Sequence, residues 1–222
     1  MADIQVLRED LRTRKAALLQ SLQAGGGSTR GIRRLLQSLS GLADQTLQAL
    51  WAQAAFPDGF ALVAVGGFGR GELFPHSDVD VLLLMPDGVS PDADDALKRR
   101  VEEFIGNCWD CGLEIGSSVR TLADCVAEAE KDVTVQTSLL ESRLVAGNRR
   151  LYTQFTKRFN AVMDPRALVE LADGKVLVVG PFDRFNGMAV PGMVRIQPTG
   201  QIDATFIPDL PIPPPHWPRK TG

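Results

Sequence analysis

Apolar residues recur at helical spacing over two stretches at the start of the chain. Between residues 4 and 22 they fall near one face of a helix, at Leu7, Leu11, Leu18 and Leu22. The glycine run 25–27 ends this helix, and Ser28 suits the N-cap of the next. The second helix has its apolar face at Ile32, Leu35, Leu36, Leu39, Leu42, Leu47 and Leu50. The pattern therefore predicts N-terminal helices over residues 1–55.

Three short apolar runs then predict strands at residues 60–65, 79–85 and 113–119, the third with apolar and polar or small residues alternating. Ser90 and Pro91 suit the start of a helix whose apolar face is Leu97, Val101, Phe104, Ile105 and Cys108. Another helical pattern begins at Asp132 and comprises Val135, Leu139, Leu140 and Leu144, and Gly147 can end it. Residues 56–163 are thus expected to form one α+β domain, a small mixed sheet with helices on one face.

Proline changes the picture at about residue 164. Ten of the 14 prolines lie between Pro165 and Pro218, and helical periodicity disappears there. Residues 164–222 are therefore predicted to be a Pro-rich, poorly ordered tail, with a short strand at 176–179.

Composition narrows the class of protein. The 222 residues are 44% apolar and 23% charged, with a net charge of −3 that gives no reason to expect nucleic-acid binding. The N-terminus lacks the apolar run of a secretory signal, and no stretch is long enough for a membrane span. Three cysteines do not suggest a disulfide framework, so the expected compartment is the cytoplasm. With only His76 and His216, any metal site must use oxygen ligands, which favours magnesium or manganese.

The clearest candidate chemistry lies where the second predicted strand begins. Asp78 and Asp80 are two residues apart on a strand, so their side chains share a face, with Cα atoms about 6–7 Å apart. Two carboxylates so placed can hold a pair of divalent cations. An Asp-x-Asp pair alone is often a solvated strand end. This pair opens a strongly apolar strand just after a glycine turn, where two charges would otherwise be costly.

The glycine-rich turn itself, Gly66 to Gly71, lets backbone N–H groups approach a triphosphate. Its spacing superficially matches a dinucleotide-binding loop. Only 12 residues separate Gly66 from Asp78, however, and Pro75 interrupts them, which leaves too little chain for a crossover helix. A Walker loop would need Gly-Lys-Ser/Thr, and a kinase-type loop would need a downstream lysine strand, and neither is present.

Other candidates are less specific. Glu114, on the third strand, is the best third carboxylate, which would complete a metal site and help deprotonate an attacking hydroxyl; the alternative is a solvent-facing residue. Arg70 could pair with a phosphate or form an ordinary surface ion pair, and Arg120 is a further candidate of this kind. Cys108 and Cys111 form an isolated CxxC with neither zinc nor redox context, with Cys108 read as core and Cys111 as incidental.

Three consecutive segments resemble bacterial PII uridylyltransferases, the bifunctional uridylyltransferase/uridylyl-removing enzymes. These segments are GGFGRGELFPHSDVDVLLL (66–84), LEIGSSVRTLADC (113–125) and DVTVQTSLLESRLVAG (132–147), within a similarity over residues 28–166. The resemblance implies a DNA polymerase β-like nucleotidyltransferase fold. It also implies Mg²⁺-dependent attack by a PII tyrosine hydroxyl on the α-phosphate of UTP.

By this resemblance, Gly66 and Gly67 match the turn that cradles the triphosphate and Ser77 a phosphate contact. Asp78 and Asp80 match magnesium ligands, and Glu114 the acidic position of the third strand. Ser117 stands where the family has histidine, and the match fails after Asp164-Pro165-Arg166. Uridylyl removal and glutamine sensing are therefore expected to be absent. The alternatives are transfer of another nucleotide or to another acceptor, as in an adenylyltransferase, and a truncated remnant that binds nucleotide or PII without turnover.

Overall fold

The computed structural model describes residues 3–25, 28–162, 167–180, 182, 184–190 and 192–206. The chain forms two compact units, which are described separately. The first unit comprises Met1–Cys125 and Ser138–Lys157, and the second comprises Val126–Thr137 and Arg158–Gly222. The N-terminal helices belong to the same compact unit as the first sheet. The expected domain limits at residues 55 and 163 stay predictions.

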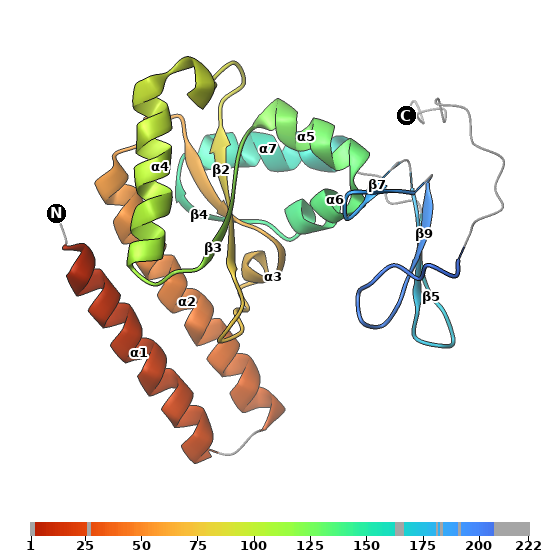
Figure 1. Ribbon diagram of the computed structural model, residues 1–222, viewed down its shortest axis with the longest axis horizontal. Coiled ribbons are helices and arrows are strands. Elements are labelled where there is room, and N and C mark those ends of the chain that lie inside the picture. The colour runs from red at the N-terminus through yellow and green to blue at the C-terminus, as the bar shows by residue number, and fades with distance from the viewer. Residues whose placement is uncertain are drawn as a thin grey trace. The chain divides into compact units, whose positions relative to one another are not determined.

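Two long helices open the first unit and run side by side (Figure 1). Helix α1 spans Ile4–Gly25 and α2 spans Thr29–Ala54, as the apolar spacing predicts. The Ser28 hydroxyl accepts a hydrogen bond from Gly31 N–H at 3.2 Å, which confirms it as the N-cap of α2. Of the glycine run, residues 26 and 27 lie outside the described residues.

A four-stranded mixed sheet in the order β3-β2-β1-β4 forms the centre of this unit. Strand β1 is Ala61–Ala64, β2 is Val79–Met85, β3 is Ile115–Thr121 and β4 is Arg143–Gly147. Strand β2 pairs with β1 antiparallel and with β3 parallel, so β2 and β3 begin at the same edge. Helix α4, Asp95–Asp110, makes the crossover between them. The α+β architecture expected from the sequence is confirmed.

Both faces of the sheet are buried, whereas helices on one face only were expected. Val81 and Leu83 of β2 pack into a core with residues of α2 and α4, and Leu82 and Leu84, on the opposite face, are also fully buried.

The start of α4 also differs from the prediction. Ser90 caps a 3₁₀ helix at Pro91–Ala93, and Asp94 is the N-cap of α4. Cys108 and Cys111 are both buried, so Cys111 is a core residue as well.

The prediction of one helix from Asp132 to Gly147 is wrong in its second half. Helix α6 spans Val133–Leu140 only, and residues 143–147 form strand β4 instead. Leu144 and its neighbours pair with β1, with Leu144 opposite Val63, so a long-range pairing overrides a local helical spacing. Two further helices were not expected: α5, Leu122–Lys131, and α7, Arg149–Val162.

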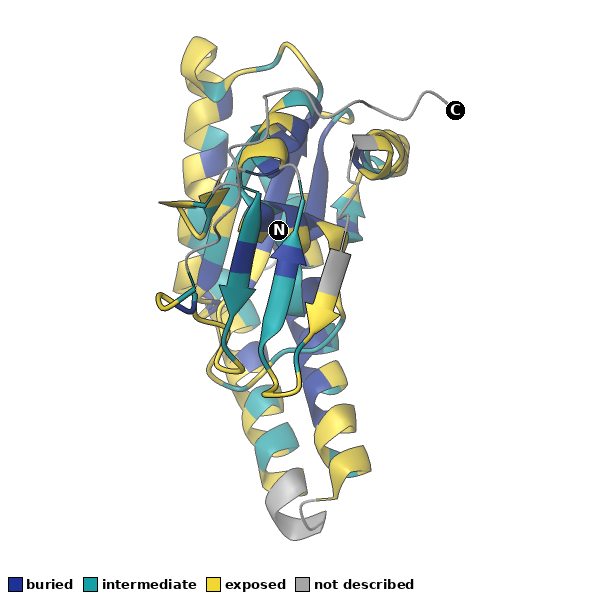
Figure 2. Cartoon of the chain, turned by 90° about the vertical axis from the view of Figure 1, so that its right-hand side faces the viewer, coloured by how far each residue is buried: buried dark blue, intermediate teal, exposed yellow. Residues whose placement is uncertain are grey.

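The second unit contains strands where the sequence analysis expected mainly poorly ordered chain. Strands β5 (Ala167–Glu170), β6 (Val176–Val179) and β9 (Met193–Ile196) form an antiparallel sheet, and β7 (Arg184–Phe185) pairs with β8 (Met188–Ala189). The strand expected at 176–179 is β6. Val178 is the buried residue of β6 and Val194 that of β9. Much of the chain's surface in this view is coloured as half-buried or exposed (Figure 2). Glycine turns reverse the chain between short apolar strands, and a small core of Val133, Val178, Phe182 and Val194 holds them together. Residues 207–222, with the triple proline and His216, lie outside the described residues.

Candidate active site

The glycine-rich segment after β1 forms one turn of helix, α3 at Gly66–Gly69. Gly66 adopts a positive φ of 57°, which lets the chain leave the strand sharply. The N–H of Val65 donates to the carbonyl of Asp80 at 3.1 Å, which ties the entry of the turn to β2. The first N–H groups of a helical turn have no partner within the helix, so those of Gly66 and Gly67 suit an anion. The short turn agrees with the exclusion of a crossover helix.

Gly69 has a different role from its neighbours, because the backbone of Glu141 passes directly over it. A Cβ on Gly69 would lie within 1.5 Å of the Glu141 carbonyl oxygen. Glycine is required here for close backbone packing between the turn and the segment that leads into β4. A Cβ on Gly67 would meet only Arg70 Nη2, at 3.6 Å. Gly69 is therefore a packing position, whereas Gly67 is an approach position, where a ligand could come close to the backbone of the turn.

Asp78 and Asp80 lie at the start of β2, both exposed, as their spacing predicts. The Asp80 carboxylate lies between two glycines. A Cβ built on Gly66 would be 3.7 Å from its Oδ2, and one built on Gly116, its β3 partner, would be 2.5 Å from its Oδ1. Partial burial raises the pKa of Asp80 above its ordinary value, and the negative charge of Asp78 raises it further. Two acids thus converge at one strand end.

The residues present fit a divalent cation at this pair. Both acids offer oxygen ligands, and neither forms an ion pair with any cationic side chain of the described segments. Asp78 and Asp80 could therefore hold such an ion.

Glu114 lies directly before β3, next to the start of β2. Its carbonyl accepts a hydrogen bond from the N–H of Val79 at 2.8 Å. Across the described parts of the chain, no three His, Cys, Asp or Glu side chains lie close enough together to hold a metal ion. Glu114 is thus adjacent in backbone position but not gathered with Asp78 and Asp80 as a third ligand, so that assignment stays a prediction.

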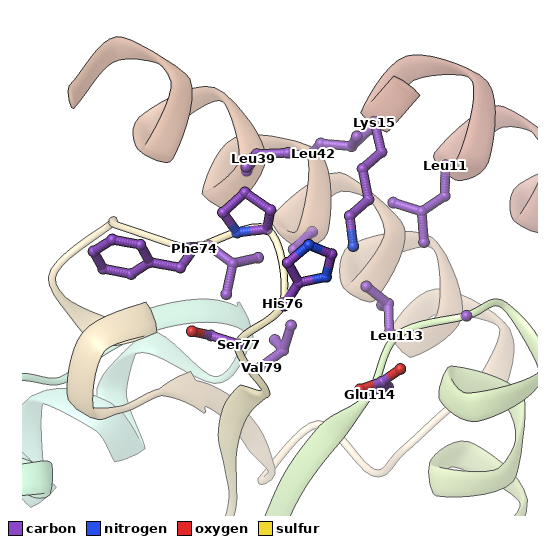
Figure 3. Close-up of a pocket in the computed structure, with 14 residues that line it drawn as sticks. Leu11, Lys15, Leu39, Leu42, Phe74, His76, Ser77, Val79, Leu113 and Glu114 are labelled. Atoms are coloured by element: carbon purple, nitrogen blue, oxygen red, sulfur yellow. The ribbon is translucent and has the colours of Figure 1, made fainter. Parts of the chain in front are cut away.

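The Glu114 side chain instead lines a cavity of about 110 Å³ on the side of α1 and α2. Figure 3 shows Lys15 reaching in from α1 toward His76, with Ser77 and Glu114 on the side of the strands. Leu39, Leu42 and Leu113 contribute its apolar wall. Ser77 and the exposed Asp78 are consecutive, so the cavity adjoins the acidic pair through this loop.

Arg70 follows the turn and forms an ion pair with Glu141. Its side chain remains half exposed, and Nη2 lies near Gly67, as noted above. A surface ion pair and proximity to the turn are thus both present.

Arg120 is placed differently, opposite Leu84 in the β2–β3 pairing and four residues along β3 from the partner of Asp80. Its charge acts on Asp124, whose pKa is lowered chiefly by hydrogen bonds from Thr121.

Sequence reasoning missed three residues that surround the turn and the acid pair. Gly116 leaves room for the Asp80 carboxylate. The Ser138 hydroxyl lies 3.6 Å from a Cβ position on Gly66, and Arg143 donates to the carbonyl of Phe68 at 3.2 Å. Ser138 and Arg143 lie in segment 132–147, which carries the family resemblance, but only the fold brings them to the turn.

Curated proteins similar to this chain are bifunctional uridylyltransferase/uridylyl-removing enzymes. The protein from Burkholderia vietnamiensis is 49% identical over 161 residues, and that from Burkholderia orbicola is 47% identical over 160 residues. Each match covers 72% of this chain and 18% of the relative. The Burkholderia pseudomallei protein is 46% identical over 163 residues, or 73% of this chain and 18% of its own. The expected resemblance is confirmed, and the chain spans about a fifth of the length of these relatives.

Two family models also match. Residues 171–206, which include β6 to β9, match "Domain of unknown function (DUF5122) beta-propeller". Residues 13–125 match "Putative nucleotidyltransferase DUF294", and this segment contains the glycine turn, the Asp78/Asp80 pair and the crossover to β3. The match covers about half of the chain. The chain therefore belongs to the DUF294 nucleotidyltransferase family.

Proposed function

We propose that this chain transfers the uridylyl group of UTP to a tyrosine hydroxyl of a PII-type signal protein, with Mg²⁺ as the divalent ion. The observation that carries the proposal is the convergence of the glycine turn and the Asp78/Asp80 pair, in a chain similar to proteins named uridylyltransferase. Because each match covers only 18% of the relative, substrate and partner are inferences about this chain.

In the proposed reaction the acceptor oxygen attacks the α-phosphorus of UTP. A new P–O bond forms, the bond from the α-phosphorus to the bridging oxygen breaks, and pyrophosphate leaves. The hydroxyl proton passes to a carboxylate or to water, and Glu114 is the carboxylate proposed from the sequence. Gly66 and Gly67 would direct N–H groups at the phosphates, and Ser77 and Arg70 would add contacts from either side of the turn.

Asp78 and Asp80 would hold the divalent ion, which when bound would offset the charge of the triphosphate. The two aspartates themselves set the position of that charge, because β2 fixes Asp80 between Gly66 and Gly116. Their proposed role is therefore to bind and orient. Manganese is compatible with the same oxygen ligands.

The test is transfer of label from α-labelled UTP to purified PII protein in the presence of magnesium. Asp80→Asn should lower the rate at least about a hundredfold, since it removes a charge at the reacting phosphate. Asp110→Asn, an exposed aspartate at the end of α4, is the matched control and should keep the wild-type rate. Equal rates for Asp80→Asn and wild type would overturn the proposal.

The same assay separates the alternatives. No residue of the described site has been identified as reading the base, so a competition series with the other nucleoside triphosphates distinguishes a uridylyltransferase from an adenylyltransferase. Nucleotide binding without label transfer to any acceptor would identify a binding remnant.

A further inference from the structure

Arg143 connects the glycine turn to helix α2. This residue begins β4 and pairs with Ala64, the last residue of β1 before the turn. Its guanidinium lies 4.8 Å from the centre of the Phe68 ring, and its Nη2 donates to the Phe68 carbonyl at 3.2 Å. One side chain therefore contacts both the ring and the backbone of a residue inside α3.

The other side of the guanidinium is anchored on α2. Nη1 of Arg143 donates to Asp44 Oδ2 at 2.7 Å, and Nη2 also donates to the Ser40 hydroxyl at 3.1 Å. Ser40 is buried, and the Arg143 and Asp44 side chains are only 29% and 22% exposed. Charge-assisted hydrogen bonds in such a partly buried setting are stronger than surface ion pairs.

The geometry is not the one that a simple ion pair would adopt. An arginine serving only Asp44 would make two parallel hydrogen bonds to its carboxylate. Here Nε of Arg143 and Oδ1 of Asp44 are buried without a hydrogen-bond partner among the described residues. Nη2 is directed to Ser40 and Phe68 instead. Unpartnered buried polar atoms cost stability. The guanidinium thus contacts Ser40 and the glycine turn at the expense of a second hydrogen bond to Asp44.

We propose that Arg143 is a positioning residue for nucleotide binding, which holds Phe68 so that the N–H groups of Gly66 and Gly67 face the triphosphate. The proposal rests on the proposed function for its substrate. Phe68 is buried and adjoins Gly67, so a shift of its peptide displaces the N–H groups that precede it. Arg143 acts through Phe68 and is not assigned contact with the nucleotide.

The test uses Arg143→Lys in the full chain. Lysine keeps the charge near Asp44 but lacks the planar fork that reaches Ser40 and Phe68 together. The KM for UTP should rise about tenfold, as expected for the loss of one charge-assisted hydrogen bond, while the KM for the PII acceptor stays the same. A purely structural defect would instead lower the active fraction, and hence kcat, without changing the KM for UTP.

Arg100→Lys is the matched control, because Arg100 also donates to a backbone carbonyl, that of Ala55, outside the site. It should leave both KM values at wild type. An unchanged KM for UTP in Arg143→Lys overturns the proposal. If that variant gives no cooperative melt, Asp44→Asn decides by the same comparison, since it removes the anchor and keeps the arginine.

Equilibrium dialysis with magnesium and UTP separates this inference from the proposed function. If wild type binds UTP but labels no acceptor, the proposed reaction fails, and a weaker dissociation constant in Arg143→Lys still supports the positioning role. If wild type binds no UTP, both proposals fail.

Discussion

The Asp80 carboxylate occupies the space that a side chain on Gly116 would fill. The two residues are partners across the parallel β2–β3 pair, and a Cβ on Gly116 would lie 2.5 Å from Asp80 Oδ1. That distance is too short for any real Cβ contact, so the position of Asp80 depends on glycine at residue 116. The position of the Asp80 carboxylate on β2 thus depends on a residue of β3.

Gly116→Ala should therefore reduce nucleotidyl transfer at least about tenfold, because the new methyl group displaces the Asp80 carboxylate. The measurement is the rate of label transfer from UTP. Gly106→Ala is the control, since a Cβ on this α4 glycine meets nothing within 4 Å. It should keep the rate and raise the free energy of unfolding by about 1 kcal/mol, as alanine does in a helix. A wild-type rate in Gly116→Ala would show that Asp80 can move without consequence.

Gly69→Ala and Gly67→Ala should affect different properties: the first should lower stability, and the second should lower the affinity for UTP. At residue 69 the new Cβ would overlap the Glu141 carbonyl, so the free energy of unfolding should fall by about 3 kcal/mol in urea titrations. At residue 67 the Cβ would make an ordinary contact with Arg70, so stability should be kept. The affinity for UTP should nevertheless fall in Gly67→Ala if this face of the turn receives the phosphates. Equal stability losses in both variants would contradict the division into packing and approach positions.

Glu141→Gln should release Arg70 from its ion pair. Both side chains are about half exposed, so the free energy of unfolding should change by less than about 1 kcal/mol. If Arg70 contacts a phosphate, the affinity for UTP should rise in Glu141→Gln and fall in Arg70→Gln. Isothermal titration with magnesium and UTP measures both. Unchanged affinity for UTP in both variants would show that Arg70 forms a surface ion pair with Glu141 and does not contact a phosphate.

The elements that local patterns predicted well are those with strong local signals. Strand β2 has the expected bounds because six of its seven residues are buried and turn residues flank it. Strand β4 was missed because Leu139, Leu140 and Leu144 fit a helical spacing, whereas the pairing of Leu144 with Val63 is set by distant chain. Apart from β6, the strands of the second unit were missed because proline content hid short runs between glycine turns.

The candidate site divides in the same way. The glycine turn and the Asp78/Asp80 pair could be predicted because one short stretch of chain, residues 66–80, contains both. Gly116, Ser138 and Arg143 could not, since each reaches the turn or the acid pair through tertiary packing. Glu114 was expected as a third carboxylate from its place on the third strand and from the family resemblance. Its side chain lines the cavity beside Lys15 and His76.

In the second unit, Asp203 accepts hydrogen bonds from the N–H and hydroxyl of Thr205 and pairs with Lys175 and Arg195. The Thr205 hydroxyl, with Lys175 and Arg195, holds the Asp203 pKa well below its usual range, against the opposing effect of burial. Because the folded-state pKa lies below the unfolded value, this acid contributes stability above about pH 4 that is lost as pH falls further.

Protection of the β6 and β9 amides from hydrogen exchange, corrected for intrinsic rates, should therefore decrease below about pH 4. Asp203→Asn should be less protected than wild type at neutral pH, because Lys175 and Arg195 lose their shared carboxylate, and its protection should depend less on pH in this range. Glu170→Gln, an exposed acid on β5, is the control and should follow wild type. An equal decrease in Asp203→Asn and wild type would place the acid sensitivity elsewhere, since only a variant without this carboxyl removes its proton linkage to unfolding.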